Sequence, residues 1–202
     1  MYSLVALVHL DGDGASAAEQ LVGLGAAVAP TMEGNFNGGD LIARFSFADE
    51  AGYRALQPAI ETILAGNGVA RADTAFYRNG AGSVGAPGLA DGVYRALLLN
   101  ACRPQSVAKR AQFDAEMVLM PKYIPAIRNW RYSPVIEASG ERPWTHVWEQ
   151  EYAGIEGLMG PYMLHPYHWA VIDRWFDPEC PDWLVDTRLC HSFGAFGRPQ
   201  LS

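Results

Sequence analysis

The chain has 202 residues, half of them hydrophobic, and a net charge of −7 from 22 acidic and 15 basic residues. This composition supports a substantial core and excludes a disordered chain. It also argues against a nucleic-acid partner, because neutralising phosphates requires clustered Lys and Arg side chains. A membrane partner is not expected either, since no apolar run approaches the roughly 18 residues that a spanning helix requires.

The first part of the chain alternates between strand-like and helix-like patterns. Apolar spacings of three and four residues predict helices, and alternating or continuous short apolar runs predict strands. Residues 33–39 are rich in turn formers and could hold a further short strand. The expected order is βαββαβ, the ferredoxin-like arrangement, with strands at 2–10, 40–47 and 69–77 and helices at 15–29 and 51–64.

The second part repeats this order of elements. A helix is expected at 106–119, with a shorter continuation at 121–127, and another at 167–176. Strands are expected at 93–101, 129–135, 144–152 and 183–192. Direct sequence identity between the two parts is slight, so the predicted repeat is one of element order.

Residues 79–92 are rich in glycine and contain a proline, a composition typical of a linker. We therefore predict a half at 1–79, a linker at 80–92 and a second half at 93–202. Each half would have one sheet face covered by helices and one bare face. Burying the bare faces against each other removes exposed apolar surface. The predicted fold class is α+β, with tandem ferredoxin-like halves forming an intramolecular barrel and a candidate pocket between the sheets.

Three cysteines, Cys102, Cys180 and Cys190, give an odd number, and no two form a C-x-x-C pair. This pattern argues against a disulfide framework and a structural zinc site. It favours a protein of the reducing cytoplasm.

Three motifs in the second half carry a resemblance to a known family. They are MPKYIPAIR at 120–128, THVWE at 145–149 and YMLHPYH at 162–168. In order and spacing they resemble the stress-responsive dimeric α+β barrel (Dabb) family, over roughly residues 93–193. The first half fits the same fold but lacks the strand histidine and the last motif. It therefore resembles a degenerate, structural copy within a tandem fusion.

The second half is similar to family members of the olivetolic acid cyclase type, which close a polyketide ring without a metal or organic cofactor. The resemblance implies that His168 is the general base, Tyr162 its supporting hydroxyl and His146 the strand histidine. Arg95 stands where the family often has a histidine, and Trp148 stands where the cyclase has a smaller residue. These departures imply a differently shaped, positively charged pocket, so the cyclase reaction itself does not transfer.

The residues give the last motif a physical rationale of their own. Pro166 suits the first helical position, where its missing N–H costs nothing. His165 would then cap the helix and His168 would lie in its first turn. The positive end of the helix dipole disfavours an imidazolium there, which keeps a histidine neutral, as a general base must be. The alternative is structural: one capping histidine and one histidine with a satisfied hydrogen bond.

Strand alternation selects the other candidate residues. His146, Trp148 and Gln150 share one face, and Val147 on the opposite face suits burial under helices. We therefore expect His146 and Trp148 to line the cavity between the sheets, with His165 beside them. By the same alternation Arg95 and Leu97 share a face and could bind a substrate anion, although Arg95 would equally suit a salt bridge at the rim.

A metal site is not expected. Three histidines could form a zinc or iron set, but no H-x-H, H-E-x-x-H or facial carboxylate pattern is present. We predict neither metal nor cofactor.

The sequence thus favours a cofactor-independent lyase, cyclase or isomerase. It would use histidine acid–base chemistry on a small aromatic or polyketide-like, anionic substrate. Three alternatives stay open: a non-catalytic small-molecule-binding or stress-response protein, a structural protein with a filled cavity, and a haem- or metal-dependent relative. The fused barrel could also associate as a homodimer.

Overall fold

The computed structural model describes residues 1–12 and 14–201 and has an α+β fold. Its strands are β1 (Tyr2–Leu10), β2 (Ala27–Pro30), β3 (Leu41–Phe47), β4 (Val69–Arg78), β5 (Ala81–Val84), β6 (Gly92–Leu99), β7 (Asn129–Ser139), β8 (His146–Tyr152) and β9 (Cys190–Phe196). Its helices are α1 (Ala15–Gly23), α2 (Glu50–Leu64), α3 (Val107–Tyr123) and the short α4 (Ile155–Gly157). After α4 come the helical turns η1 (Leu158–Tyr162), η2 (Tyr167–Ile172) and η3 (Asp173–Trp175).

The strands form one antiparallel sheet in the order β2-β3-β1-β4-β7-β8-β6-β9, with β5 also paired to β7. The two ends of this sheet approach each other. The backbones of Phe36 and His191 exchange two hydrogen bonds of 2.8 Å, and the amide of Met32 donates to the carbonyl of Phe193 at 2.9 Å. The sheet is therefore a nearly closed barrel.

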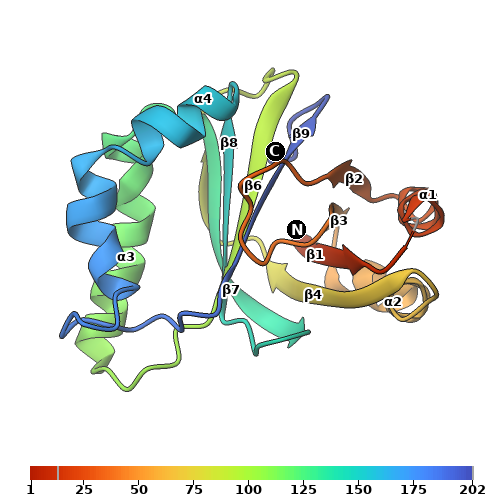
Figure 1. Ribbon diagram of the computed structural model, residues 1–202, viewed down its shortest axis with the longest axis horizontal. Coiled ribbons are helices and arrows are strands. Elements are labelled where there is room, and N and C mark those ends of the chain that lie inside the picture. The colour runs from red at the N-terminus through yellow and green to blue at the C-terminus, as the bar shows by residue number, and fades with distance from the viewer. Residues whose placement is uncertain (13, 202) are drawn as a thin grey trace.

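Helices cover the barrel on two opposite sides (Figure 1). Helices α1 and α2 pack on the outer face of β1, β3 and β4, where they bury Leu21, Tyr53 and Ile60. Helix α3 and the helical turns of 155–175 pack on the outer face of β6 and β8, where Phe113 and Met117 meet Leu97 and Trp148. The barrel interior lies between these two layers.

Several element boundaries differ from those expected. The helix expected at 15–29 ends at Gly23, because Gly25 takes a positive φ of 94° that ends a helix. Residues 27–30 then form β2, and 33–39 form no strand. The closing strand expected at 183–192 begins only at Cys190, because Leu184 and Val185 are instead buried, with both amides donating to the carbonyl of Trp175.

The expected linker also contains a strand. Residues Ala81–Val84 pair with Asn129–Tyr132 of β7 and so extend the barrel. The helix expected at 106–119 and its continuation are a single helix, α3, which runs to Tyr123.

The space between the two halves is filled, which corrects the expectation of a cavity there. Fourteen buried apolar residues pack together in the interior: Val5, Leu7, Ala29, Ile42, Ala75, Tyr77, Tyr94, Ala96, Leu98, Trp144, Val147, Cys190, Phe196 and Leu201. Val147 is among them, so the alternating partners His146, Trp148 and Gln150 point outward, toward the helices. The faces of β8 are thus the reverse of those expected.

One ion pair crosses this interior. The Nε of Arg44 on β3 donates to Oε1 of Glu149 on β8 at 2.7 Å, and their side chains are 3% and 0% exposed. The hydroxyl of Tyr94 donates to the same carboxylate oxygen at 2.8 Å, and Ser3 accepts from Arg44 at 3.2 Å. The pair therefore joins the two halves at a point that water does not reach.

Breaking this ion pair should cost far more stability than breaking an exposed one. We expect Glu149→Gln to lower the free energy of unfolding by about 3–5 kcal/mol, because it leaves the buried Arg44 guanidinium without a counter-charge. Glu50→Gln removes a partner from the exposed Arg54 and should cost less than about 1 kcal/mol. Urea unfolding of both variants checks this, and similar losses in the two would contradict it.

Candidate functional site

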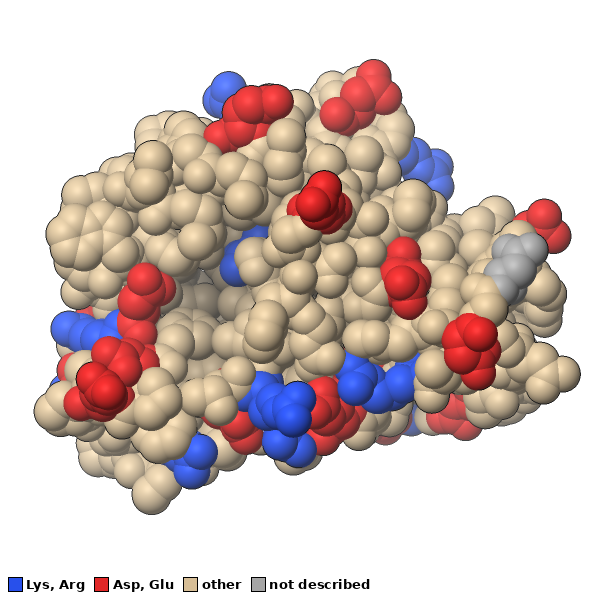
Figure 2. All heavy atoms as spheres, in the orientation of Figure 1, with Lys and Arg blue, Asp and Glu red and all other residues tan. Residues whose placement is uncertain are grey.

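The titratable side chains of the second half converge on a cleft of about 240 Å³ between the sheet and the helical layer. Figure 2 shows the surface hollowed between these layers, on the left of the view. Strand β6 contributes Arg95 and Leu97, β9 contributes His191, and the helical turns contribute Tyr162, His168 and Asp173. Apolar side chains form the remaining wall: Met117, Met120, Met163, Ile172, Phe176 and Leu189.

Arg95 is the fixed charge of this cleft. It is 4% exposed, and its Nε donates to Nε2 of His191 at 2.5 Å while Nη1 donates to Oε1 of Gln150. Gln150 is itself held by the hydroxyl of Tyr152 at 2.8 Å. The guanidinium carbon lies 5.1 Å from the centre of the Tyr162 ring. Arg95 is therefore held in place by hydrogen bonds on two sides, and its positive charge lies beside the Tyr162 ring.

The contact with Arg95 also fixes the state of His191. An arginine is always protonated and can only donate, so Nε2 of His191 must accept and the ring proton sits on Nδ1. Burial, Arg95 and His168 together lower the pKa of His191 well below its ordinary value. His191 is thus a neutral donor within the cleft.

His168 is a neutral base at pH 7. Burial and the nearby Arg95 guanidinium lower its pKa to about 4. Its Nδ1 is buried without a hydrogen-bond partner among the described residues, and lies 3.7 Å from Oδ1 of Asp173. The sequence predicted a neutral histidine, but from the dipole of a helix. His168 does lie in the first turn of a helical element, η2, but burial is the main cause of its lowered pKa.

Tyr162 is the partner of His168. Its ring centre lies 4.6 Å from that of His168, and the phenol is 2% exposed. Burial raises the pKa of Tyr162 while the positive charge of Arg95 opposes the rise. Tyr162 therefore stays protonated and can donate a hydrogen bond to an oxygen in the cleft.

The structure brings together four of the seven predicted residues, namely Arg95, Leu97, Tyr162 and His168. The other three do not line this cleft. His146 occupies a separate shallow hollow, where its Nε2 is 3.6 Å from Oδ1 of Asp114. Trp148 is fully buried against Trp130 and Tyr132, outside the lining. His165 accepts a hydrogen bond at Nδ1 from the amide of Tyr167, at 3.1 Å, and so stabilises the turn.

Two polar residues of the cleft were not predicted, His191 and Asp173. His191 lies directly opposite Leu97 across the β6–β9 ladder, and so on the same face as Arg95. Alternation along β9 could have placed it on a face, but only the register shows that this face is the one that carries Arg95. Asp173 lies five residues after His168 in a succession of helical turns, and carries no pattern that would mark it.

The part of the chain that the structure describes carries no candidate metal-ion cluster and no candidate membrane span. No group of three His, Cys, Asp or Glu side chains there could hold a metal ion. No helix within the described residues has the length and apolar character to cross a membrane.

Comparison with known proteins supports the fold of the second half. Residues 93–186 match the family model described as the stress responsive A/B barrel domain, or Dabb. No curated protein matches the chain. Among solved structures, the chain is similar to an anthrone oxidase-like protein, with 9% identity, a TM-score of 0.61, and 96% of this chain and 90% of that chain covered.

Two further structures show how varied the proteins of this fold are. A mutant chlorite dismutase from Candidatus Nitrospira defluvii is 8% identical, with a TM-score of 0.54 over 96% of this chain and 90% of that chain. A major regulator of staphylococcal pathogenesis is 7% identical, with a TM-score of 0.51 over 98% of this chain and 99% of that chain. At such identities the likeness concerns the fold alone, so function must be argued from the cleft. Residues 93–186 thus match the Dabb family model and lie within an α+β barrel.

The buried, neutral state of His168 should make the protein sensitive to acid. The unfolded chain binds a proton at this residue below about pH 6.5, whereas the folded protein does so only near pH 4. Stability is therefore lost as the pH falls from 6.5 toward 4, because the unfolded state binds more protons. When the pH falls from 7 to 5, the free energy of unfolding of the unaltered protein should decrease. In His168→Asn we expect this decrease to be smaller, by up to about 2 kcal/mol. Urea unfolding at both pH values checks this, and equal losses would contradict it.

Proposed function

We propose that this protein is a cofactor-independent lyase, cyclase or isomerase of the cytoplasm, acting on a small, anionic, aromatic or polyketide-like compound. The observation that carries the proposal is the juxtaposition of a neutral, buried His168, whose Nδ1 has no hydrogen-bond partner in the described part of the chain, with the clamped charge of Arg95. The site is the cleft between strands β6 and β9 and the helical layer of the second half, in place of the inter-sheet cavity expected from the sequence.

The lining of the cleft supports this class of substrate. Arg95 supplies a fixed positive charge for a carboxylate or an enolate oxygen, and the Nδ1–H of His191 adds a neutral donor. The remaining wall is apolar and suits the flat body of an aromatic or polyketide-like compound. The volume of about 240 Å³ limits the ligand to a small molecule.

The same groups can carry out proton transfer next to a carbonyl. His168 would remove a proton from the carbon beside the carbonyl group, and the electron pair of that C–H bond would move onto the carbonyl oxygen. The Arg95 guanidinium would stabilise the resulting negative charge, and the Tyr162 hydroxyl would donate a hydrogen bond or the proton to that oxygen. Return of the proton to a different atom completes an isomerisation. Attack of the enolate on a second carbonyl closes a ring.

The proposal gives the two halves different roles. We interpret residues 1–79 and 93–202 as tandem ferredoxin-like halves, each with the order βαββαβ, although the last helix of the second half is replaced by helical turns. The first half serves as scaffold, because it lacks the histidine motif. His146, in its separate hollow, receives no role at the reacting atoms.

A proton-exchange assay tests this function. Aryl keto acids such as 4-oxo-4-phenylbutanoate carry an aromatic ring, a carboxylate and slowly exchanging protons beside a ketone. In D₂O the protein should accelerate loss of those protons, followed by NMR. His168→Gln should slow the exchange by about 10²- to 10⁴-fold, the usual contribution of a general base, and Arg95→Gln should raise KM.

His9→Gln provides the matched control, because His9 lies on β1 beside Arg71 and Asp73, away from the cleft. It should leave the exchange rate unchanged. An unchanged rate in His168→Gln would reject His168 as the base. Binding of the keto acids without exchange would favour the alternative, a non-catalytic small-molecule-binding or stress-response protein.

A further inference from the structure

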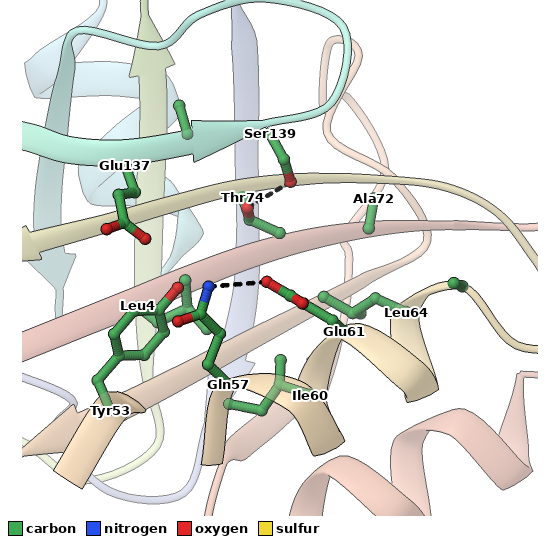
Figure 3. Close-up of a pocket in the computed structure, with 12 residues that line it drawn as sticks. Leu4, Tyr53, Gln57, Ile60, Glu61, Leu64, Ala72, Thr74, Glu137 and Ser139 are labelled. Atoms are coloured by element: carbon green, nitrogen blue, oxygen red, sulfur yellow. Dashed lines mark hydrogen bonds between the residues drawn. The ribbon is translucent and has the colours of Figure 1, made fainter. Parts of the chain in front are cut away.

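A second cleft, of about 500 Å³, lies on the other side of the molecule, in the first half. Figure 3 shows it between helix α2 and the sheet. Helix α2 packs over β1, β3 and β4, but the sheet continues past β4 into the end of β7, where Ser139 pairs with Thr74. The cleft opens at this junction, within the size range of small-molecule sites. It shares no lining residue with the cleft that contains His168.

The floor and one wall of this cleft are apolar. Leu4 of β1 and Ile60 of α2 are each 2% exposed, and Leu64 with three alanines, Ala65, Ala72 and Ala138, completes the apolar surface. Such a wall can bury the apolar part of a ligand, but it does not select one chemical group over another.

The charged side chains of the cleft can only accept hydrogen bonds, while its other polar side chains, Tyr53, Gln57, Thr74 and Ser139, carry both donors and acceptors. Two carboxylates line it, Glu61 and Glu137, with a hydroxyl pair on the opposite wall, where the Thr74 and Ser139 oxygens are 2.7 Å apart. Figure 3 shows Gln57 and Glu61 on the helix, across from that hydroxyl pair. No Lys or Arg side chain belongs to the lining.

The two carboxylates are not equivalent. Glu137 is neutralised by Arg54, whose Nη1 and Nη2 contact its two oxygens. The same guanidinium also binds Glu50, at 2.7 Å. Glu61 accepts only an uncharged hydrogen bond among the described contacts, from Nε2 of Gln57 at 2.8 Å. The amide oxygen of Gln57 is already occupied by Arg54, at 3.1 Å. Glu61 therefore retains a negative charge without a cation beside it.

We propose that this cleft binds a small organic ammonium ion with an apolar body. The ammonium group would donate to the Glu61 carboxylate and to the Thr74 and Ser139 hydroxyl oxygens, while its body covers Leu4, Ile60 and Leu64. An anion is disfavoured because the lining carries two carboxylates, Glu61 and Glu137, and no Lys or Arg side chain. The site is independent of the chemistry proposed for His168.

Three probes of similar shape test this: benzylammonium, benzyl alcohol and benzoate. Each is titrated into the full chain labelled with ¹⁵N, and amide shifts locate the site. Benzylammonium should shift residues 57–65, 72–74 and 137–139 and bind at least about threefold to fivefold more tightly than benzyl alcohol, as expected for a partly exposed ion pair. Added salt should reduce that advantage. Benzoate should not shift these residues.

A charge-removing variant separates the role of Glu61 from that of the apolar wall. Glu61→Gln should weaken the binding of benzylammonium by the factor by which it exceeds that of benzyl alcohol. The affinity for benzyl alcohol should not change. Glu19→Gln, on the exposed face of α1, is the matched control and should change neither. Equal binding of benzylammonium and benzyl alcohol, binding of benzoate at these residues, or an unchanged affinity in Glu61→Gln would each overturn the proposal. So would the absence of shifts with all three probes.

Discussion

The Arg44–Glu149 pair crosses the interior of the barrel, and the arrangement of both halves depends on how it is buried. Arg44 belongs to the first half and Glu149 to the second. Two charges are retained in such an interior when they meet each other and further hydrogen bonds satisfy most of their polar atoms. Tyr94 donates to the Glu149 oxygen that also binds Arg44, and Ser3 and Ser46 accept from Arg44. Oε2 of Glu149 has no hydrogen-bond partner among the described residues. The two bare sheet faces are therefore held together by apolar packing around one polar contact.

This constraint decides which side chains line the candidate cleft. Because side chains alternate along a strand, burying Glu149 and Val147 in the interior turns His146, Trp148 and Gln150 outward, toward α3 and the helical turns. In the same way Tyr94 points inward and Arg95 outward. The groups that can act on a substrate are thus beneath the helical layer of the second half, and the barrel interior is reserved for packing.

The electrostatics of the cleft follow from Arg95. Its Nε holds His191 as a neutral acceptor, and its charge acts with burial to keep His168 unprotonated. Burial, with this one cation as a second cause, thus keeps two histidines neutral, and the cation also opposes the rise in the pKa of Tyr162. The second cleft, in the first half, has the opposite character, since its unneutralised group is the carboxylate of Glu61. The two clefts therefore differ in charge, since Arg95 lines one of them and Glu61 and Glu137 line the other.

The sequence by itself determined the α+β class, most of the helices and strands, and four residues of the cleft. It could do so because periodicity and the YMLHPYH motif depend on neighbours along the chain. It did not determine which face of β8 points inward, since alternation gives two faces but no direction. His191 lines the cleft because strand register places it opposite Leu97, and this register could not be read from the sequence. His146 does not line the cleft, because its pairing with Leu99 places it nearer the other end of the same sheet face. Only the tertiary structure decided these points, because they depend on which side of the sheet another segment covers.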